Sequence, residues 1–191
     1  MRWLTLYARS RQVPASLAAV VFGALVVWAL AGIGGGTLGD PRLIMLILTA
    51  GAMAFSVGLG GQDRALDRTA AIRWMPRRAA HVLLCGVLIG AVLLAVQTLS
   101  GQSVSAAFVV RNSAGLIGLV AFGAAWCGVQ YAWIPPFAWL SVSFVVPPAS
   151  GVGTQVLTWM MLPTGTPTAT WTALVLAVAG TAVYAVGGPR R

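Results

Sequence analysis

The sequence contains no lysine and no glutamate, and only 8% of its 191 residues are charged. The charged side chains are twelve arginines and three aspartates, and there is a single histidine. Because soluble domains carry about 25% charged residues, this composition excludes a soluble globular protein. A chain without lysine also has no GxxxxGK[ST] phosphate-binding loop, so it cannot itself be a P-loop ATPase.

Catalytic and metal-binding groups are equally scarce. A nucleophilic enzyme needs a base and an orienting group, and a hydrolase needs paired carboxylates or a metal, which these few side chains do not supply. Cys85 and Cys127 lie in apolar runs, so we interpret them as core residues and exclude a disulfide-stapled secreted domain. We therefore expect no enzyme activity, no metal and no cofactor in the chain itself.

Long stretches without charge predict membrane spans. The chain is 59% apolar with a mean hydropathy of +0.88, and a spanning helix needs about 20 apolar residues. The expected fold is therefore an all-α, polytopic integral membrane protein with one transmembrane domain, 1–191, and about six transmembrane helices. The six spans are 15–32, 43–60, 82–99, 113–130, a broken segment 137–162, and 170–186. The isoelectric point near 11.5 is explained by arginines that flank spans, so we expect no nucleic-acid partner.

The fifth segment, 137–162, is interrupted by Pro147-Pro148 and by two glycines. Its apolar pieces are about ten residues long, and a helix of that length rises only about 15 Å, half the hydrocarbon thickness. We expect the segment to cross once, with 147–167 as a re-entrant element on the outer side. Irregular backbone at this depth must be covered, and a second protomer is the expected cover. Trp159, Met160 and Met161 are predicted to form an apolar plug over a pathway; alternatively, they only fill space between helices.

The arginines also predict the orientation. With a cytoplasmic N-terminus and six spans, ten arginines lie inside and only Arg42 and Arg111 lie outside, as the positive-inside rule requires. Both termini are then cytoplasmic. In this arrangement Arg111 is interpreted as an interfacial residue whose side chain reaches toward the headgroups, with a pair to Asp40 as a second possibility.

The most polar stretch is the loop 61–81, which holds five arginines and two aspartates. It is long enough for a short helix on the membrane surface. Such a helix has one polar side, formed by Asp63, Arg64, Asp67 and Arg68, and one side formed by Ala65, Leu66, Thr69 and Ile72. The pattern predicts a docking element for a soluble partner. The alternative is a solvated loop that serves only the topology.

This layout resembles the membrane subunit of a type-2 ABC exporter, of the kind encoded beside a separate ATPase gene in actinobacteria. The features that carry the resemblance are the basic segment MRWLTLYARSR, the polar loop between spans two and three, the Pro/Gly-broken fifth element and the six spans. The resemblance implies a bacterial cell-membrane location, an interfacial N-terminal helix within 1–14, and an outer re-entrant hairpin. It also implies a coupling helix that contacts the ATPase, with the residues Asp63, Arg64, Asp67, Arg68, Ile72, Arg73 and Trp74.

The partners implied are a soluble ATPase subunit, which binds the ATP, and a second membrane subunit that is identical or a paralogue. A pathway without fixed charges favours a hydrophobic or amphipathic cargo. Two other functions stay open. One is a non-transport membrane partner, such as an immunity protein, and the other is a secondary carrier. A carrier is disfavoured because no predicted span contains a carboxylate and the chain has no internal repeat.

Overall fold

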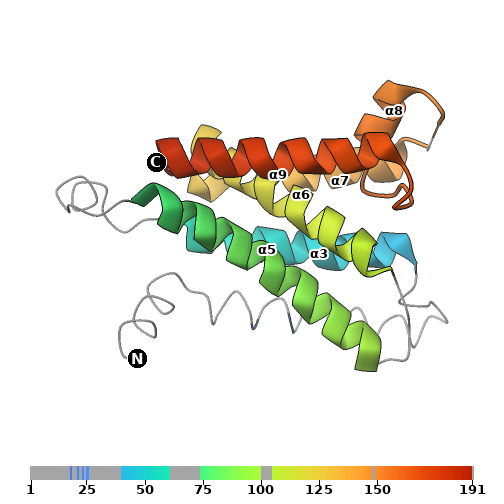
Figure 1. The fold of residues 1–191 in the computed structure, drawn as a ribbon, viewed down its shortest axis with the longest axis horizontal. Coiled ribbons are helices and arrows are strands. Elements are labelled where there is room, and N and C mark those ends of the chain that lie inside the picture. Colours follow the sequence, from blue (N-terminus) through green and yellow to red (C-terminus); the bar gives the residue numbers. More distant parts are fainter. Residues whose placement is uncertain are drawn as a thin grey trace.

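The computed structural model describes residues 40–60, 74–99, 105–147 and 149–190, together with positions 18, 21, 23 and 25. Throughout these residues the chain forms helices and turns (Figure 1), which confirms the all-α prediction for this part. The elements are α3 (Pro41–Ser56), the 3-10 turn η1 (Val57–Leu59), α5 (Trp74–Leu99), α6 (Ala106–Trp126), the 3-10 turn η2 (Val129–Tyr131), α7 (Ile134–Val145), α8 (Val152–Leu157) and α9 (Pro167–Gly187).

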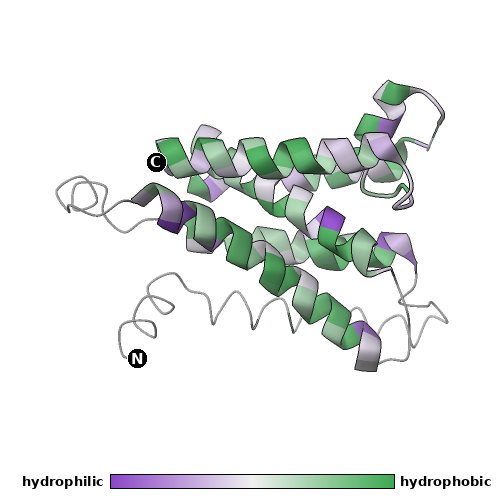
Figure 2. Cartoon of the chain, in the orientation of Figure 1, coloured by the Kyte–Doolittle hydropathy of each residue, from purple (hydrophilic) through white to green (hydrophobic). Residues whose placement is uncertain are grey.

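Four of these helices are long and apolar enough to cross a membrane: α3 with η1, α5, α6 and α9. Figure 2 shows apolar colour along their length, with polar colour gathered at the start of α5 and in one turn of α6. They correspond to expected spans two, three, four and six, and they fit a membrane protein. The first span, 15–32, and the interfacial segment, 1–14, lie almost wholly outside the described residues, so the count of six spans stays a prediction.

Two helices begin earlier than the sequence pattern predicted. Helix α5 begins at Trp74 rather than near residue 82, so the last third of the expected loop forms the first two turns of a helix. Pro76 is tolerated there because the first turn lacks intrahelical N–H partners in any case. Helix α6 begins at Ala106 rather than near residue 113. The reason is that the charge at Arg111 is satisfied inside the protein and does not end the helix.

The broken fifth segment forms two short helices. Helix α7 has 12 residues and is therefore about 18 Å long, which is less than the hydrocarbon thickness, and α8 has six residues. Pro135-Pro136 follows the predicted span four, 113–130, in the sequence. This pair lies in the first turn of α7, where proline fits the backbone and removes no hydrogen bond.

Helix α6 lies at the centre of the bundle: 67% of its membrane-length window is buried, against 28% for α9. Its closest neighbour is α9. A Cβ atom added to Gly180 would overlap the carbonyl group of Gly118, and one added to Gly118 would overlap the backbone at Leu176. The two backbones approach this closely because glycine has no side chain, which is the usual means of tight helix packing in lipid.

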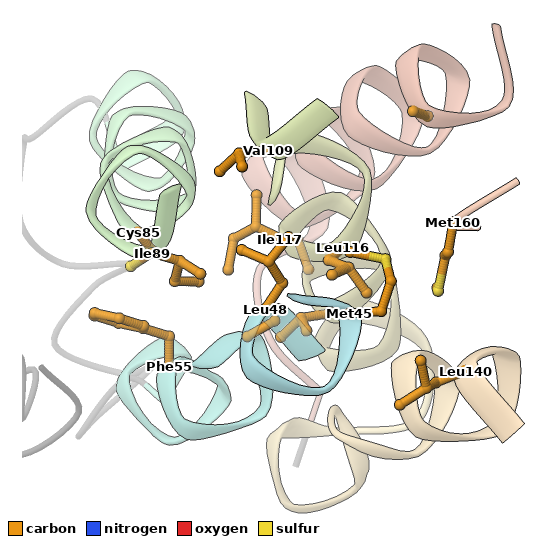
Figure 3. Close-up of a cluster of buried hydrophobic side chains, with 14 of the residues drawn as sticks. Met45, Leu48, Phe55, Cys85, Ile89, Val109, Leu116, Ile117, Leu140 and Met160 are labelled. Carbon is orange, nitrogen blue, oxygen red and sulfur yellow. The ribbon is translucent and has the colours of Figure 1, made fainter. Parts of the chain in front are cut away.

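The apolar core joins α3, α5 and α6 (Figure 3). Met45 and Leu48 of α3 lie against Leu116 and Ile117 of α6, while Ile89 of α5 closes the cluster from the side. All five side chains are at most 2% exposed. The core therefore holds α3, α5 and α6 together.

Hydrogen bonds define these two ends. At one end, the Tyr184 hydroxyl donates to the Leu59 carbonyl at 2.7 Å, and Arg190 donates to the Trp126 carbonyl at 3.3 Å. We call this the Arg190 end, and α5 begins there. At the other end, α3, α6 and α9 begin, and Arg111 donates to the Pro163 carbonyl at 3.0 Å. We call this the Arg111 end.

Candidate functional site

The residues predicted for the coupling helix fall mainly outside the described part of the chain. This is true of Asp63, Arg64, Asp67, Arg68, Ile72 and Arg73. Trp74 is described and is the first residue of α5. Its ring is half-buried, and the Arg77 guanidinium lies 5.9 Å from its centroid. The coupling role of these residues stays a prediction.

The best-defined polar site is formed by Arg111 near the start of α6. Its side chain is only 8% exposed. Nη1 donates to the Pro163 carbonyl at 3.0 Å, and Nη2 donates to the carbonyls of Trp159 and Leu162 at 3.3 and 2.6 Å. The guanidinium also lies 5.2 Å from the centroid of the Phe108 ring. The charge is thus held inside the protein by carbonyl dipoles and an aromatic face.

Both earlier interpretations of Arg111 are therefore wrong. The side chain does not reach toward the headgroups, because it is buried and all three of its described acceptors lie in one turn of the same chain. Asp40 is not its partner either. The Asp40 carboxylate accepts from the backbone N–H of Arg42 at 2.9 Å and caps α3. Aspartate is a preferred N-cap residue, since it satisfies a helix N–H that has no intrahelical acceptor.

The neighbouring Asn112 extends this site. It is fully buried, and its Nδ2 donates to the Met160 carbonyl at 3.4 Å. Arg111 and Asn112 together contact four carbonyls of the turn after α8. We call these two residues and the turn 159–163 the Arg111 clamp. The clamp supplies donors to carbonyls that the end of α8 leaves without intrahelical partners.

Helix α7 satisfies the remaining end of α8. Trp139 Nε1 and Ser143 Oγ both donate to the Leu157 carbonyl, at 3.0 and 2.9 Å. Side chains of α6 and α7 from the same chain thus donate to five carbonyls at and after the end of α8, those of Leu157, Trp159, Met160, Leu162 and Pro163. Because these carbonyls have donors within the same chain, they do not require a second protomer to cover them.

The three predicted plug residues lie at this site but differ in exposure. Trp159 and Met160 are fully buried, and the Trp159 ring lies directly on Gly115, where a Cβ atom would overlap it. Met161 is partly buried and lines a crevice of about 370 Å³ with Asp40, Arg42 and the end of α7. The structure brings the three together around the clamp, and their role as a plug stays a prediction.

Three polar atoms of the clamp are buried without a hydrogen-bond partner among the described residues: Arg111 Nε, Asn112 Oδ1 and Trp159 Nε1. The polar side-chain groups of the clamp are the guanidinium of Arg111, the amide of Asn112 and the indole of Trp159. The clamp contains neither a nucleophile–base pair nor a carboxylate. It can therefore bind and hold polar groups, but it has no group that performs proton transfer or covalent chemistry.

One further pair was missed in the sequence. His81 Nε2 lies 3.8 Å from Cys85 Sγ, one turn away on α5, and both side chains are buried. The spacing of four residues on a helix could have predicted this contact. In the described part of the chain, no group of three or more His, Cys, Asp or Glu side chains could hold a metal ion.

Comparisons with family models, with curated proteins and with solved structures find no match for this chain.

Proposed function

We propose that the chain is the membrane-spanning permease subunit of an ATP-driven exporter of the type-2 ABC class. The observation that carries this proposal is the broken element α7–α8, which the Arg111 clamp holds at one end of the molecule, whereas Gly60 and Trp74 lie at the other end. These two residues flank the arginine-rich segment 61–73 in the sequence. An exporter driven by a separate motor needs a docking element on the motor side. It also needs an element that controls passage on the far side, and this pair of features fits both requirements.

We propose that the Arg190 end faces the cytoplasm of a bacterial cell membrane. Arg77, Arg78 and Arg190 gather there, and two of them lie over tryptophan rings, Arg77 over Trp74 and Arg190 over Trp126, each at 5.9 Å. Arginine and tryptophan together are typical of the cytoplasmic membrane interface. In this orientation the segment 61–73 also lies on the cytoplasmic side, where an ATPase is found.

In this proposal the segment that contains Arg64 and Arg68 forms the coupling helix, and a separate ATPase subunit binds and hydrolyses the ATP. Helix α5 follows the segment directly and packs on α6, which carries the clamp. A displacement of the coupling helix would therefore reach the outer turn through two packed helices, since packed helices resist continuous deformation.

The outer tip of α7 and α8 is the proposed contact with a second membrane subunit, identical or a paralogue. Val145 is 82% exposed, Val152 69% and Leu157 43%. We propose that these side chains face the second subunit. The crevice lined by Met161 would then be the outer mouth of the pathway, with Trp159 and Met160 behind it. The charge-poor spans suit a hydrophobic or amphipathic cargo, although the mouth itself carries Asp40 and Arg42.

Copurification tests this proposal. The chain is expressed with a tagged ATPase encoded by the neighbouring gene, and the mass of the purified complex is measured. We expect a complex of two membrane subunits and two ATPase subunits. A stable complex with a partner that has no P-loop would instead assign the chain to the non-transport membrane proteins.

A further inference from the structure

The Arg111 clamp buries three polar atoms that no described residue satisfies: Arg111 Nε, Asn112 Oδ1 and Trp159 Nε1. Arg111 is 8% exposed, and the other two side chains are fully buried. In folded proteins nearly all buried polar groups bind either another protein group or ordered water, because an unsatisfied group costs more than a typical hydrogen bond gains. Three such atoms in one site therefore indicate a ligand.

The three side chains meet on one face of α6. Arg111 Nη2 donates to the carbonyl of Trp159 at 3.3 Å, and Asn112 Nδ2 donates to the carbonyl of Met160 at 3.4 Å. The Trp159 ring lies on Gly115, where a Cβ atom would overlap it. Gly115 is three and four residues after Asn112 and Arg111, so all three positions are neighbours on the surface of the helix.

The chemistry of these atoms selects the ligand. Arg111 Nε and Trp159 Nε1 can only donate a hydrogen bond, whereas Asn112 Oδ1 can only accept one. An anion would satisfy the two donors but would be repelled by the amide oxygen, and a metal ion would be repelled by the guanidinium. Water donates and accepts, so it satisfies both kinds of atom.

A route for water leads to the clamp from the Arg111 end. Arg111 is the sixth residue of α6, so it lies only about 8 Å from the start of that helix. Met161 belongs to the clamp and also lines the crevice of about 370 Å³, together with the exposed residues Asp40 and Arg42. A crevice of this size holds far more than one water molecule.

We infer that the Arg111 clamp binds ordered water, which enters from this crevice and hydrogen-bonds Arg111 Nε, Asn112 Oδ1 and Trp159 Nε1. A charged side chain within a membrane protein is costly unless protein groups or water solvate it. Water at the clamp completes the solvation that the carbonyls of the turn 159–163 begin. This inference is independent of whether the protein is an exporter.

X-ray footprinting tests the inference, because X-rays generate hydroxyl radicals from water in place and these oxidise nearby methionine and tryptophan side chains. The full chain is irradiated in nanodiscs. Mass spectrometry of its peptides then gives the oxidation rate of each side chain, divided by the intrinsic reactivity of the free amino acid. Met45 is the matched control, because it is as fully buried as Trp159 and Met160 but lies in the apolar core, at the fifth residue of α3.

We expect Trp159 and Met160 to be oxidised at rates close to that of the partly buried Met161, and Met45 to be protected. Protection of Trp159 and Met160 to the level of Met45 would overturn the inference. The wild-type chain alone is sufficient for this decision.

Two variants at neighbouring positions add a second readout. Asn112→Leu removes the acceptor and nearly keeps the volume of the side chain, so we expect the oxidation rate of Trp159 to fall to the level of Met45. Ser113→Ala is the control, since this buried hydroxyl already donates to the Val110 carbonyl at 3.1 Å, and its oxidation pattern should match the wild type. Equal oxidation of Trp159 in the two variants would contradict water held by Asn112.

Replacing chloride by gluconate distinguishes water from a bound anion. We expect the thermal midpoint of the wild type to stay unchanged. A midpoint that rises with chloride in the wild type but not in Trp159→Phe, which lacks one of the two donors, would assign the site to an anion and overturn the inference.

Discussion

The guanidinium of Arg111 donates a 2.6 Å hydrogen bond from Nη2 to the carbonyl oxygen of Leu162, which lies 51 residues further along the chain. This contact ties the central helix α6 to the turn between α8 and α9. A cation inside a membrane protein is costly unless it is satisfied, and here its partners are backbone carbonyls that would themselves be unsatisfied without it.

Replacing Arg111 tests how much the clamp contributes to stability. Arg111→Met leaves the carbonyls of Trp159, Leu162 and Pro163 without their donor. We expect a loss of about 2–5 kcal/mol in the free energy of unfolding, taking about 0.6–1.7 kcal/mol for each hydrogen bond inside a membrane protein. Denaturant unfolding in detergent micelles measures the loss.

The matched control for this variant is Arg42→Met. Arg42 is exposed at the same end of the molecule, and only its backbone N–H takes part in the cap of α3. We expect its free energy of unfolding to stay within about 0.5 kcal/mol of the wild-type value. Equal stability of the Arg111→Met and Arg42→Met variants would mean that the clamp does not stabilise the fold.

Because of the close contact between α6 and α9, we expect a glycine-to-alanine substitution to affect stability differently at two positions of α9. Gly180→Ala places a methyl group against the Gly118 carbonyl, and overpacking of this kind costs about 1–3 kcal/mol. Gly187→Ala places the same methyl group in open space, so its stability should be unchanged or raised by up to about 1 kcal/mol. The thermal midpoints of the two variants provide the comparison. Similar midpoints would contradict the close approach.

Cysteine labelling checks the orientation. Cys127 is exposed at the Arg190 end, whereas Cys85 is buried. We expect a membrane-impermeant maleimide to label Cys127 only after cells are permeabilised, because the Arg190 end faces the cytoplasm in our proposal. In a Cys127→Ser background, Arg42→Cys should be labelled in intact cells. Labelling of Cys127 from outside would reverse the orientation.

Crosslinking checks the proposed contact of the α7–α8 tip with a second subunit. Trp159 and Met160 are fully buried, so cysteines placed there cannot reach another protein. Val145→Cys and Val152→Cys replace strongly exposed side chains and should form disulfides between two copies in a cysteine-free background. Val178→Cys, exposed on α9, should not. Equal crosslinking at all three positions would indicate random collision rather than an interface.

The sequence predicted the long helices well because their signal is local. Each of α3, α6 and α9 is an uninterrupted or nearly uninterrupted apolar run, and hydrocarbon thickness alone sets the length required. Pro147-Pro148 likewise predicted the break after α7, since interior proline removes a backbone hydrogen bond. Charges were less reliable markers of helix ends: Arg77, Arg78 and Arg111 all lie inside helices.

The Arg111 clamp could not be predicted because its partners are backbone carbonyls. Any residue supplies a carbonyl, so the positions 159, 160, 162 and 163 carry no side-chain signal for the contact. The one signal present is an Arg-Asn pair inside an apolar run, followed later in the chain by a Pro/Gly-broken segment. That pattern indicates donors and unsatisfied acceptors, and their meeting depends on the tertiary packing of α6 and α9.

The central claim is that a separate ATPase drives this membrane subunit through the segment 61–73. The most direct test is how much ATPase copurifies with the chain, and how far the chain stimulates ATP hydrolysis, when Arg64 and Arg68 are both replaced by glutamate. We expect this double variant to insert in the membrane normally but to lose ATPase binding and stimulated hydrolysis, while Arg42→Glu, at the opposite end, keeps both. A double variant that binds the ATPase and stimulates hydrolysis as the wild type does would contradict the claim.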